Sequence, residues 1–310
     1  MNKENGSGLP LVTINIPAYR QEKYIARAIQ SAVAQDYPNL QVIVPDDCSP
    51  DDTFEVARAF ASNKVQVHKT PRNLGRVGNY HHLLYHLSAG DWVVNLDGDD
   101  FYSDPTFIST AINLVTKHPS AVMYAAGASS IDEERGRITA SPIKLAGNVN
   151  VVKGTDYVLN FYKWGQIGQH FSVLYNRKLA LETNFYILDS LGADTDSICR
   201  LALKGDVIIH KKYVGVWTSH KGNASYSLNI RNVQKEFAML ESIAGAAYQY
   251  LPRAVVDRWL KESKQLKYKQ SLYNSLPNEK FKEALVLLLK NWTWEVQSFK
   301  EVVKIFLRLI

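Results

Sequence analysis

The stretch Asn95-Leu96-Asp97-Gly98-Asp99-Asp100 places three carboxylates directly after the apolar run 92–94, which predicts a short buried strand. At the end of such a strand the carboxylates repel one another. A divalent cation would offset this repulsion, and Mg²⁺ and Mn²⁺ prefer carboxylate and phosphate oxygens. Gly98 allows a tight turn and leaves room for a ligand. Because Asp also favours turns and N-caps, an acidic turn without a metal stays open at this point.

Strands and helices alternate on both sides of this stretch. Apolar runs predict strands at 11–16, 40–44, 65–68, 92–94 and 121–126, and helical spacing predicts helices at 24–35, from 53, from 80 and at 105–118. The helix 24–35 carries one apolar face, made of Ile25, Ala28, Ile29, Ala32 and Val33. This alternation predicts an α/β fold with a mostly parallel sheet flanked by helices.

Distinctive residues follow each of the first four strands, namely Pro17–Tyr19, Asp46–Asp47, Asn73–Arg76 and Asp97–Asp100. In a parallel sheet, ligands bind beyond the carboxyl ends of the strands. We therefore expect these four segments to converge on one crevice. Such convergence favours a ligand site over a mere acidic turn.

The second half of the chain is less regular. We expect a hairpin around 133–136, loops with a short helix over 141–165, and a strand ending at 175. A helix is expected after Asp194, followed by short strands at 207–210 and 213–217. From 230 onward the pattern predicts helices.

Composition indicates an ordinary globular chain. The 310 residues are 46% hydrophobic and 21% charged, enough for one large domain or two. Cys48 and Cys199 give no disulfide framework, which favours a reducing compartment. Residues 1–8 are polar and lack the apolar core of a signal peptide, and no run of about 18 uncharged apolar residues predicts a spanning helix. These features predict a cytoplasmic location.

The net charge of +6 is unevenly distributed. Residues 1–230 balance at 22 basic and 22 acidic side chains, whereas residues 231–310 carry 14 against 8. In 292–310 an apolar stripe lies beside Lys300, Lys304 and Arg308, with two tryptophans at the start. This pattern predicts an interfacial helix on an anionic membrane surface. A helix docked on the rest of the chain or on a dimer partner is the alternative.

The motifs together resemble those of the family 2 glycosyltransferases with the GT-A fold, over about residues 11–225. In order, they are Pro17-x-Tyr19 with Glu22, Asp46-Asp47-x-Ser49, Asn73-x-Gly75, Asp97-x-Asp99-Asp100, Asp194 before a helix, and His220 with Asn223-x-Ser225. Pro45, Cys48, Arg20 and Ala193 depart from this pattern. Cys48 replaces the usual glycine, Arg20 an Asn, and Ala193 a Glu.

The resemblance implies a Rossmann-like catalytic domain over 1–228 and a basic helical region over 229–310. It implies an inverting transfer of a sugar from a nucleotide-diphosphate donor, favouring UDP, to an acceptor hydroxyl. The acceptor would be a glycan or lipid-linked saccharide of bacterial surface-polysaccharide assembly, at the inner face of the plasma membrane. Asp99 would hold Mn²⁺ or Mg²⁺ on the diphosphate, with His220 as a second ligand or a purely structural residue.

The remaining roles are assigned to the motif residues in the same way. Asp97 would bind the ribose, Gly98 would contact the nucleotide, and Pro17, Tyr19, Glu22 and Asp47 would contact the base or other parts of the nucleotide. For Asp46 and Asp47 the alternative is a cap of the helix at Thr53. Arg76 would bind the diphosphate, or else form a surface salt bridge. The roles of Asp46 and Asp100 stay open.

The general base is expected on the helix that begins near Asp194. Asp194 is the candidate, since a carboxylate away from the metal can take the acceptor's hydroxyl proton. Asp196 is the alternative base, and N-capping is the alternative role for Asp194. Gln169 and His170 are expected to face the acceptor.

Other classes of protein are less well supported. A non-catalytic sugar-nucleotide-binding scaffold would not need Asp97, Asp99 and Asp194 together. A sugar-phosphate nucleotidyltransferase would want a glycine-rich basic loop after the first strand, and 17–20 is not one. A nucleic-acid partner is not expected, because no recognised binding module is present.

Overall fold

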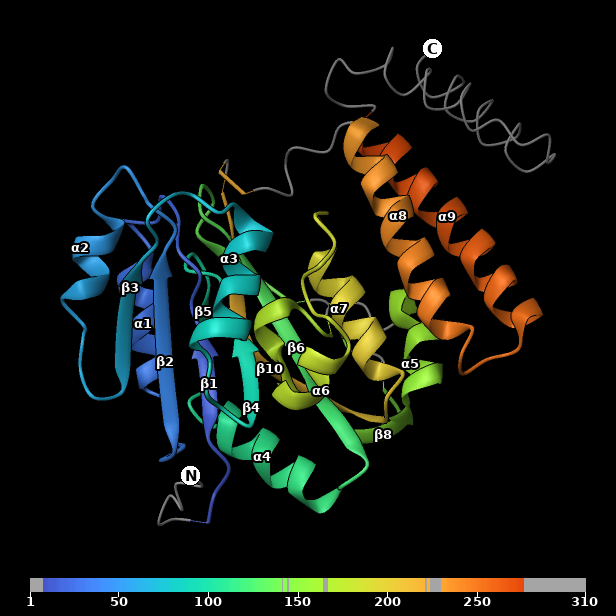
Figure 1. Cartoon of the computed structure of the whole chain (residues 1–310), viewed down its shortest axis with the longest axis horizontal. Coiled ribbons are helices and arrows are strands. Elements are labelled where there is room, and N and C mark those ends of the chain that lie inside the picture. Colours follow the sequence, from blue (N-terminus) through green and yellow to red (C-terminus); the bar gives the residue numbers. More distant parts are fainter. Residues whose placement is uncertain are drawn as a thin grey trace.

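The computed structural model describes residues 8–140, 142–143, 145–163, 167–220, 222–223 and 230–275. A curled sheet runs through the protein, with helices on both faces (Figure 1). Its strand order is β3 (Val65–Lys69), β2 (Leu40–Asp46), β1 (Val12–Asn15), β4 (Trp92–Asn95), β9 (Val173–Asn176), β6 (Ala121–Asp132), β10 (Asp206–Ser219) and β5 (Phe101–Tyr102). Two further strands, β7 (Arg137–Thr139) and β8 (Val149–Lys153), pair with β6 and β10. The predicted α/β class is confirmed.

The N-terminal half of the sheet is parallel, as predicted. β1 lies between β2 and β4, with Val12 opposite both Leu40 and Trp92, and β2 pairs in parallel with β3. All four residues of β1 are buried, as expected for a strand covered on both faces. Beyond β4 the directions are mixed, because β9 runs antiparallel to both β4 and β6. The carboxyl ends of β1, β2, β3 and β4 therefore meet at one edge.

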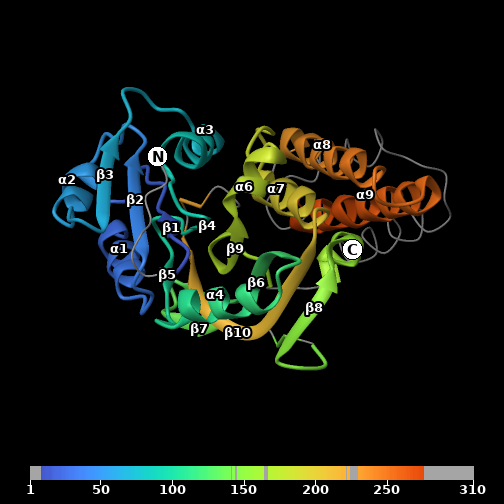
Figure 2. The same ribbon diagram turned by 60° about the horizontal axis from the view of Figure 1, so that its bottom comes forward.

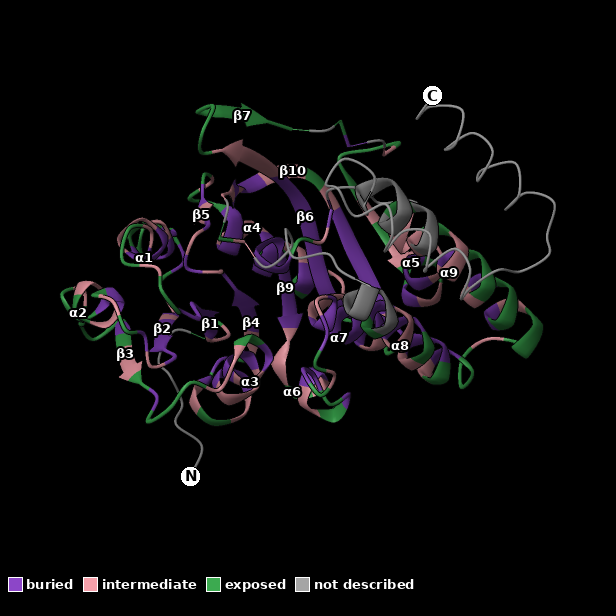
Figure 3. Ribbon diagram, turned by 90° about the horizontal axis from the view of Figure 1, so that it is seen from above, coloured by how far each residue is buried: buried purple, intermediate pink, exposed green. Residues whose placement is uncertain are grey.

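Helices cover the sheet on both sides (Figures 2 and 3). One face carries α1 (Ile25–Val33), α2 (Thr53–Arg58) and α4 (Phe107–Lys117), and the other carries α3 (Arg76–His82), α6 (Arg177–Glu182) and α7 (Ala193–Ala202). α3 continues directly into the π-helical turn Leu83–Leu87. The apolar face predicted for α1 is buried except at Val33, which is 42% exposed. Each face of the sheet has its own hydrophobic core.

The second half of the chain differs in detail from the prediction. The hairpin around 133–136 is present between β6 and β7. β10 is one strand of 14 residues rather than two, because register shifts near Tyr213 let the pairing with β6 continue past the polar residues 211–212. β8 and α6 were not predicted. The helix α6 begins where the Asn176 side chain accepts a hydrogen bond from the Leu179 N–H, at 3.1 Å.

The C-terminal helices pack against the body of the protein. α8 (Ile230–Ala247) and α9 (Arg253–Ser275) form a hairpin beside α7 and α5 (Gly154–Leu159) (Figure 1). Leu240 and Ile243 of α8 and Trp259 of α9 belong to the same core as α3 and α7. Within the described residues, no helix is long and apolar enough to cross a membrane. The amphipathic helix predicted at 292–310 lies outside the described residues.

Candidate active site

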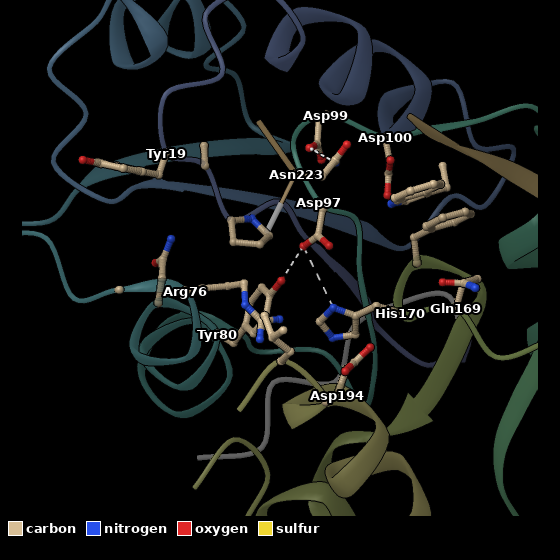
Figure 4. A pocket seen from close by; sticks show the side chains of 18 of the residues that line it. Tyr19, Arg76, Tyr80, Asp97, Asp99, Asp100, Gln169, His170, Asp194 and Asn223 are labelled. Atoms are coloured by element: carbon tan, nitrogen blue, oxygen red, sulfur yellow. Dashed lines mark hydrogen bonds and ion pairs between the residues drawn. The ribbon is translucent and has the colours of Figure 1, made fainter. Parts of the chain in front are cut away.

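A cavity of about 660 Å³ opens at the carboxyl ends of the parallel strands (Figure 4). Its lining includes segments that follow β1, β2, β3 and β4, as the sequence predicted. The residues from these segments are Pro17, Ala18, Tyr19, Asp47, Asn73, Gly75, Arg76, Asp97, Asp99 and Asp100. The rest of the lining includes residues from the second half of the chain, namely Gln169, His170, Leu191, Gly192, Asp194, Thr195, Trp217, Asn223, Glu236 and Lys267. Polar side chains of both signs therefore surround a space of ligand size.

Asp47 ties together the loops that follow β2 and β3. Its Oδ1 accepts hydrogen bonds from the Leu74 N–H (2.7 Å) and the Thr70 hydroxyl (3.2 Å), and the Asn73 amide donates to its backbone carbonyl. Neither Asp46 nor Asp47 caps α2, since the side chain that accepts from the Thr53 N–H is that of Asp51. The predicted alternative of a helix cap is therefore wrong for both residues.

Asp46 is fully buried and holds the turn after β2. Its Oδ2 accepts from the Ser49 N–H at 3.1 Å, and its other oxygen has no partner among the described residues. Tyr19 is 41% exposed at the rim of the cavity, and the Arg20 guanidinium lies 5.2 Å from its ring centre. An exposed aromatic ring at the rim is available for stacking on a flat ligand.

Glu22 and Gly98 do not line the cavity, although both were predicted to bind the nucleotide. Glu22 is exposed, and its carboxylate accepts a hydrogen bond from the Asp52 N–H at 3.2 Å. Gly98 is covered by the Gln21 side chain, whose Oε1 would lie 2.0 Å from a Cβ at this position. Gly98 therefore serves the close packing of the turn, and the prediction that Glu22 contacts the ligand is not supported by its position.

Asp97 is held by two aromatic neighbours (Figure 4). The Tyr80 hydroxyl donates to Asp97 Oδ1 at 2.8 Å, and His170 Nδ1 lies 4.0 Å from the same oxygen. Burial, with the charge of Asp97 as the second cause, raises the pKa of Tyr80 well above its usual value. Tyr80 thus stays a hydrogen-bond donor to Asp97 at physiological pH. The other oxygen of Asp97 faces no described donor.

A buried polar network supports this arrangement from behind. His170 Nε2 lies 2.8 Å from the Tyr186 hydroxyl, which accepts from the Asn95 amide at 3.1 Å. The Asn15 amide in turn donates to Asn95 Oδ1 at 3.3 Å. Because the network joins β1, β4 and the turn before β9, it fixes the His170 ring relative to Asp97.

Asp99 is bound by residues that follow β10. His220 Nε2 and the Asn223 amide lie 3.0 and 3.3 Å from Asp99 Oδ2. His220 Nδ1 accepts from the Gly222 N–H, so Nε2 carries the proton that is donated to Asp99. The His220 ring stacks on Tyr24 with ring centres 5.0 Å apart. In this arrangement His220 is a hydrogen-bond donor to Asp99, and its predicted role as a metal ligand would require the other tautomer.

Asp100 connects the acidic turn to the neighbouring strand β10. It is buried and accepts a hydrogen bond from the Thr218 N–H at 2.8 Å, which links the acidic turn to β10. Burial and the charges of Asp99 and Asp97 raise its pKa well above the usual range. Burial and the charge of Asp97 also raise the pKa of Asp99. The three carboxylates therefore repel one another, as expected from the sequence.

The residues present fit a divalent cation for which the protein supplies only some of the ligands. Among the described residues no group of three or more His, Cys, Asp and Glu side chains is arranged to hold a metal. Mg²⁺ is commonly bound through one or two carboxylates, with water and substrate phosphates as the other ligands. Asp97 and Asp99 meet this description, because burial and, in second place, the charge of Asp97 raise the pKa of Asp99 and a cation would offset both.

Arg76 and Asp194 lie on the side of the cavity formed by α3 and α7. Arg76 keeps an exposed surface, but its guanidinium lies over the Tyr80 ring and donates to the Ser190 carbonyl at 2.5 Å. Burial lowers the pKa of its guanidinium, but the interactions with Tyr80 and Asp194 outweigh burial, so that the net shift is upward. Asp194, in the first turn of α7, lines the cavity, whereas Asp196 is fully buried and paired with Arg200. Asp196 is therefore not available as a base.

The sequence did not identify several residues that line the cavity, among them Tyr80, Glu236 and Lys267. Tyr80 was given no role in the site, although Arg76 and Tyr80 stand four residues apart and so share a helix face. Glu236 and Lys267 come from α8 and α9, where no motif distinguishes them from other charged helix residues. Only the folded arrangement brings them to the cavity.

Comparison with known proteins identifies the family. Residues 13–182 match the model of glycosyl transferase family 2, which is more than half of the chain, so the chain belongs to this family. The chondroitin synthase of Escherichia coli is 30% identical over 131 residues, 42% of this chain and 19% of that protein. The first curated relatives are each matched over less than half of their own length.

Solved structures share the fold. TarS 1-349 of S. aureus in complex with UDP-GlcNAc matches with a TM-score of 0.69 at 18% identity, over 90% of this chain and 79% of that one. The mannosyltransferase PcManGT of Pyrobaculum calidifontis, in complex with GDP-Man and Mn²⁺, matches with a TM-score of 0.59 at 16% identity, over 96% and 80%. The expected GT-A fold is confirmed.

Proposed function

We propose that this protein is an inverting glycosyltransferase that moves a sugar from a nucleotide-diphosphate donor, in the first instance a UDP-sugar, to an acceptor hydroxyl. The observation that carries the proposal is the placement of Asp97, Asp99 and Asp194 on one cavity. Figure 4 shows Asp97 between the other two carboxylates. A leaving group on the Asp99 side and a base on the Asp194 side suit in-line attack on a sugar that lies between them.

The chain's own groups divide the chemistry. Asp47 and the Tyr19 ring lie where they can bind the base and ribose, and Asp97 is positioned for the ribose or the diphosphate. Arg76, with its fixed positive charge, favours a phosphate group in this part of the cavity. Asp194 accepts the proton of the acceptor hydroxyl as the new bond forms. A bound Mn²⁺ or Mg²⁺ at Asp99 would neutralise the charge of the departing diphosphate.

The donor class is supported by the neighbours. TarS binds UDP-GlcNAc on the same fold, and the archaeal mannosyltransferase binds GDP-Man with Mn²⁺. The chondroitin synthase similarity supports a role in polysaccharide assembly. We extend the proposal to a glycan or lipid-linked acceptor, and to a cytoplasmic protein that meets the inner face of the plasma membrane through 292–310.

Calorimetric titration of UDP, with and without Mn²⁺, tests the donor side. Wild type, Asp99→Ala and Asp189→Ala are compared, since Asp189 is an exposed carboxylate that does not line the cavity. We expect Mn²⁺-dependent binding in the wild type and in Asp189→Ala, and its loss in Asp99→Ala. GDP and dTDP serve as second ligands. If the wild type binds none of the three nucleotides, a scaffold without transferase activity would be favoured.

A further inference from the structure

One wall of the cavity comes from the C-terminal helices. Glu236 of α8 and Lys267 of α9 line it together with Gly192 and Asp194 of the α7 region. α8 packs closely on the start of α7, because a Cβ at Gly192 would lie 2.3 Å from Met239 Sδ and 3.4 Å from Glu236 Oε1. The Glu236 carboxylate therefore lies beside the turn that carries the proposed base.

Only one oxygen of this carboxylate is used within the described protein. Lys267 Nζ lies 2.8 Å from Glu236 Oε2, while Oε1 has no hydrogen-bond partner among the described residues. Glu236 is only 6% exposed. A buried acceptor without a donor is costly, and native proteins leave few such atoms unexplained. An unused acceptor on the wall of a cavity points to a donor that arrives with the ligand.

Two buried hydroxyls behind this wall also lack partners among the described residues, although neither residue lines the cavity. They are Ser190 Oγ, two residues before Gly192, and the Tyr162 hydroxyl. Burial, and in second place the charge of Glu236, raise the pKa of Tyr162, which places this hydroxyl in the field of the carboxylate. Of these atoms only the carboxylate belongs to a lining residue, and a carboxylate suits a neutral ligand whose hydroxyl groups donate to it. It does not suit a phosphate.

We propose that Glu236, held in place by Lys267, accepts a hydrogen bond from a hydroxyl group of an acceptor saccharide, so that the α8–α9 hairpin determines which acceptor is used. The inference rests on the proposed transferase function. Glu236 determines acceptor binding and takes no part in proton transfer, which belongs to Asp194. The two carboxylates come from packed neighbours, α7 and α8, and so meet one saccharide from adjacent positions (Figure 1).

The hairpin contains a matched control. Lys264 Nζ lies 2.5 Å from Glu241 Oε1, an ion pair between the same two helices. Glu241 and Lys264 do not line the cavity. Glu241→Gln therefore removes an ion pair between the same two helices, more exposed than that of Glu236, without touching the proposed subsite. Any effect that stems from loosening of the hairpin would appear in this variant too.

The experiment compares wild type, Glu236→Gln, Glu236→Asp and Glu241→Gln. The donor is whichever of UDP-GlcNAc, UDP-glucose, UDP-galactose and GDP-mannose the wild type hydrolyses with Mn²⁺, and the acceptors are p-nitrophenyl glycosides of the same four sugars. We expect the KM for the acceptor to rise roughly tenfold in Glu236→Gln, as the loss of a charge-assisted hydrogen bond predicts, with partial rescue in Glu236→Asp. Donor hydrolysis without acceptor should be unchanged in Glu241→Gln, which lies outside the cavity.

Three results would overturn the inference. An unchanged acceptor KM in Glu236→Gln, or an equal rise in Glu241→Gln, would remove the role of this carboxylate. A wild type that hydrolyses the donor but glycosylates none of the four glycosides would show that this wall does not take a saccharide. Failure to hydrolyse any donor is a different outcome, because it would overturn the proposed function itself.

Discussion

Asp194 and Asp196 stand two residues apart on α7 and lie in opposite environments. Asp194 lines the cavity and makes no side-chain hydrogen bond with any residue that the structure describes. Asp196 is fully buried, with its Oδ2 3.0 and 2.8 Å from two nitrogens of Arg200. Because neighbours at this spacing point to different sides of a helix, one carboxylate is free for a ligand and the other holds the fold.

Replacing Asp194 by Asn should remove activity and leave the fold intact. The amide has the same shape but cannot accept a proton, and general bases typically contribute about 10²–10⁴-fold to the rate. We expect transfer to fall by this amount, while the Kd for UDP stays within about twofold, since the donor side of the cavity is not changed. Turnover and calorimetry on the same preparation measure both. A variant with full turnover would show that another group takes the proton.

Replacing Asp196 by Asn should have the opposite effect. Arg200 would keep its bonds to the carbonyls of Thr183 and Asn184 but lose its buried counter-charge. Breaking a buried pair by removing one partner costs about 3–5 kcal/mol. We place this variant at the low end of that range, because the two carbonyls still accept from the guanidinium. Urea unfolding measures the loss. A stable Asp196→Asn variant that has lost turnover would instead give Asp196 a catalytic role.

The donor side of the cavity could be predicted because its residues follow the strands that position them. Three of the four parallel strands are short and mostly apolar, β3 being the exception, and the residues after each strand reach the same edge whatever the loop details are. The acceptor side could not be predicted in this way. Its residues come from 3₁₀ turns, from α7 and from the helices α8 and α9, and their juxtaposition depends on long-range packing.

Two sequence departures have a backbone explanation that only the structure supplies. Arg20 and Cys48 replace an Asn and a Gly of the family pattern, and both have a φ of 56°. Asn and Gly are the residues that adopt this left-handed conformation most readily. In this chain both departures therefore fall at positions with a left-handed backbone. Glu22 illustrates the converse, because its place in a motif suggested binding and its side chain holds a loop instead.

Asp206 should make stability depend on pH. Hydrogen bonds from Lys153 and from the Ser120 hydroxyl lower its pKa in the folded protein. A lowered folded pKa stabilises the fold above the unfolded pKa of about 3.9, and this contribution disappears as the pH falls through the folded value. Asp206→Asn should therefore be less stable than wild type by roughly 0.5–1 kcal/mol at pH 7.

The difference between Asp206→Asn and wild type should vanish in acid. Urea unfolding at pH 7, 5 and 3 measures it. Lys153→Met is the companion variant, since it removes the first of the two donors, and its loss of stability should also diminish in acid. This loss should be smaller at high salt, because salt already screens the exposed Lys153 ammonium of the wild type. A difference that persists undiminished at pH 3 would mean that packing, and not charge, accounts for the effect.

Cys48→Gly should stabilise the protein. A side chain in the left-handed region costs about 1–2 kcal/mol, and glycine loses about 0.5–1 kcal/mol through the greater freedom of the unfolded chain. The net gain expected from the φ of 56° is therefore about 0.5–1 kcal/mol. Cys48→Ala keeps the Cβ and should give no gain, which separates backbone strain from loss of the thiol. The preceding residue, Asp47, stays fixed by its hydrogen bond from the Leu74 N–H. Relief of strain at position 48 should therefore leave UDP binding unchanged. Equal stabilities for the Gly and Ala variants would show that the turn after β2 carries no strain at Cys48.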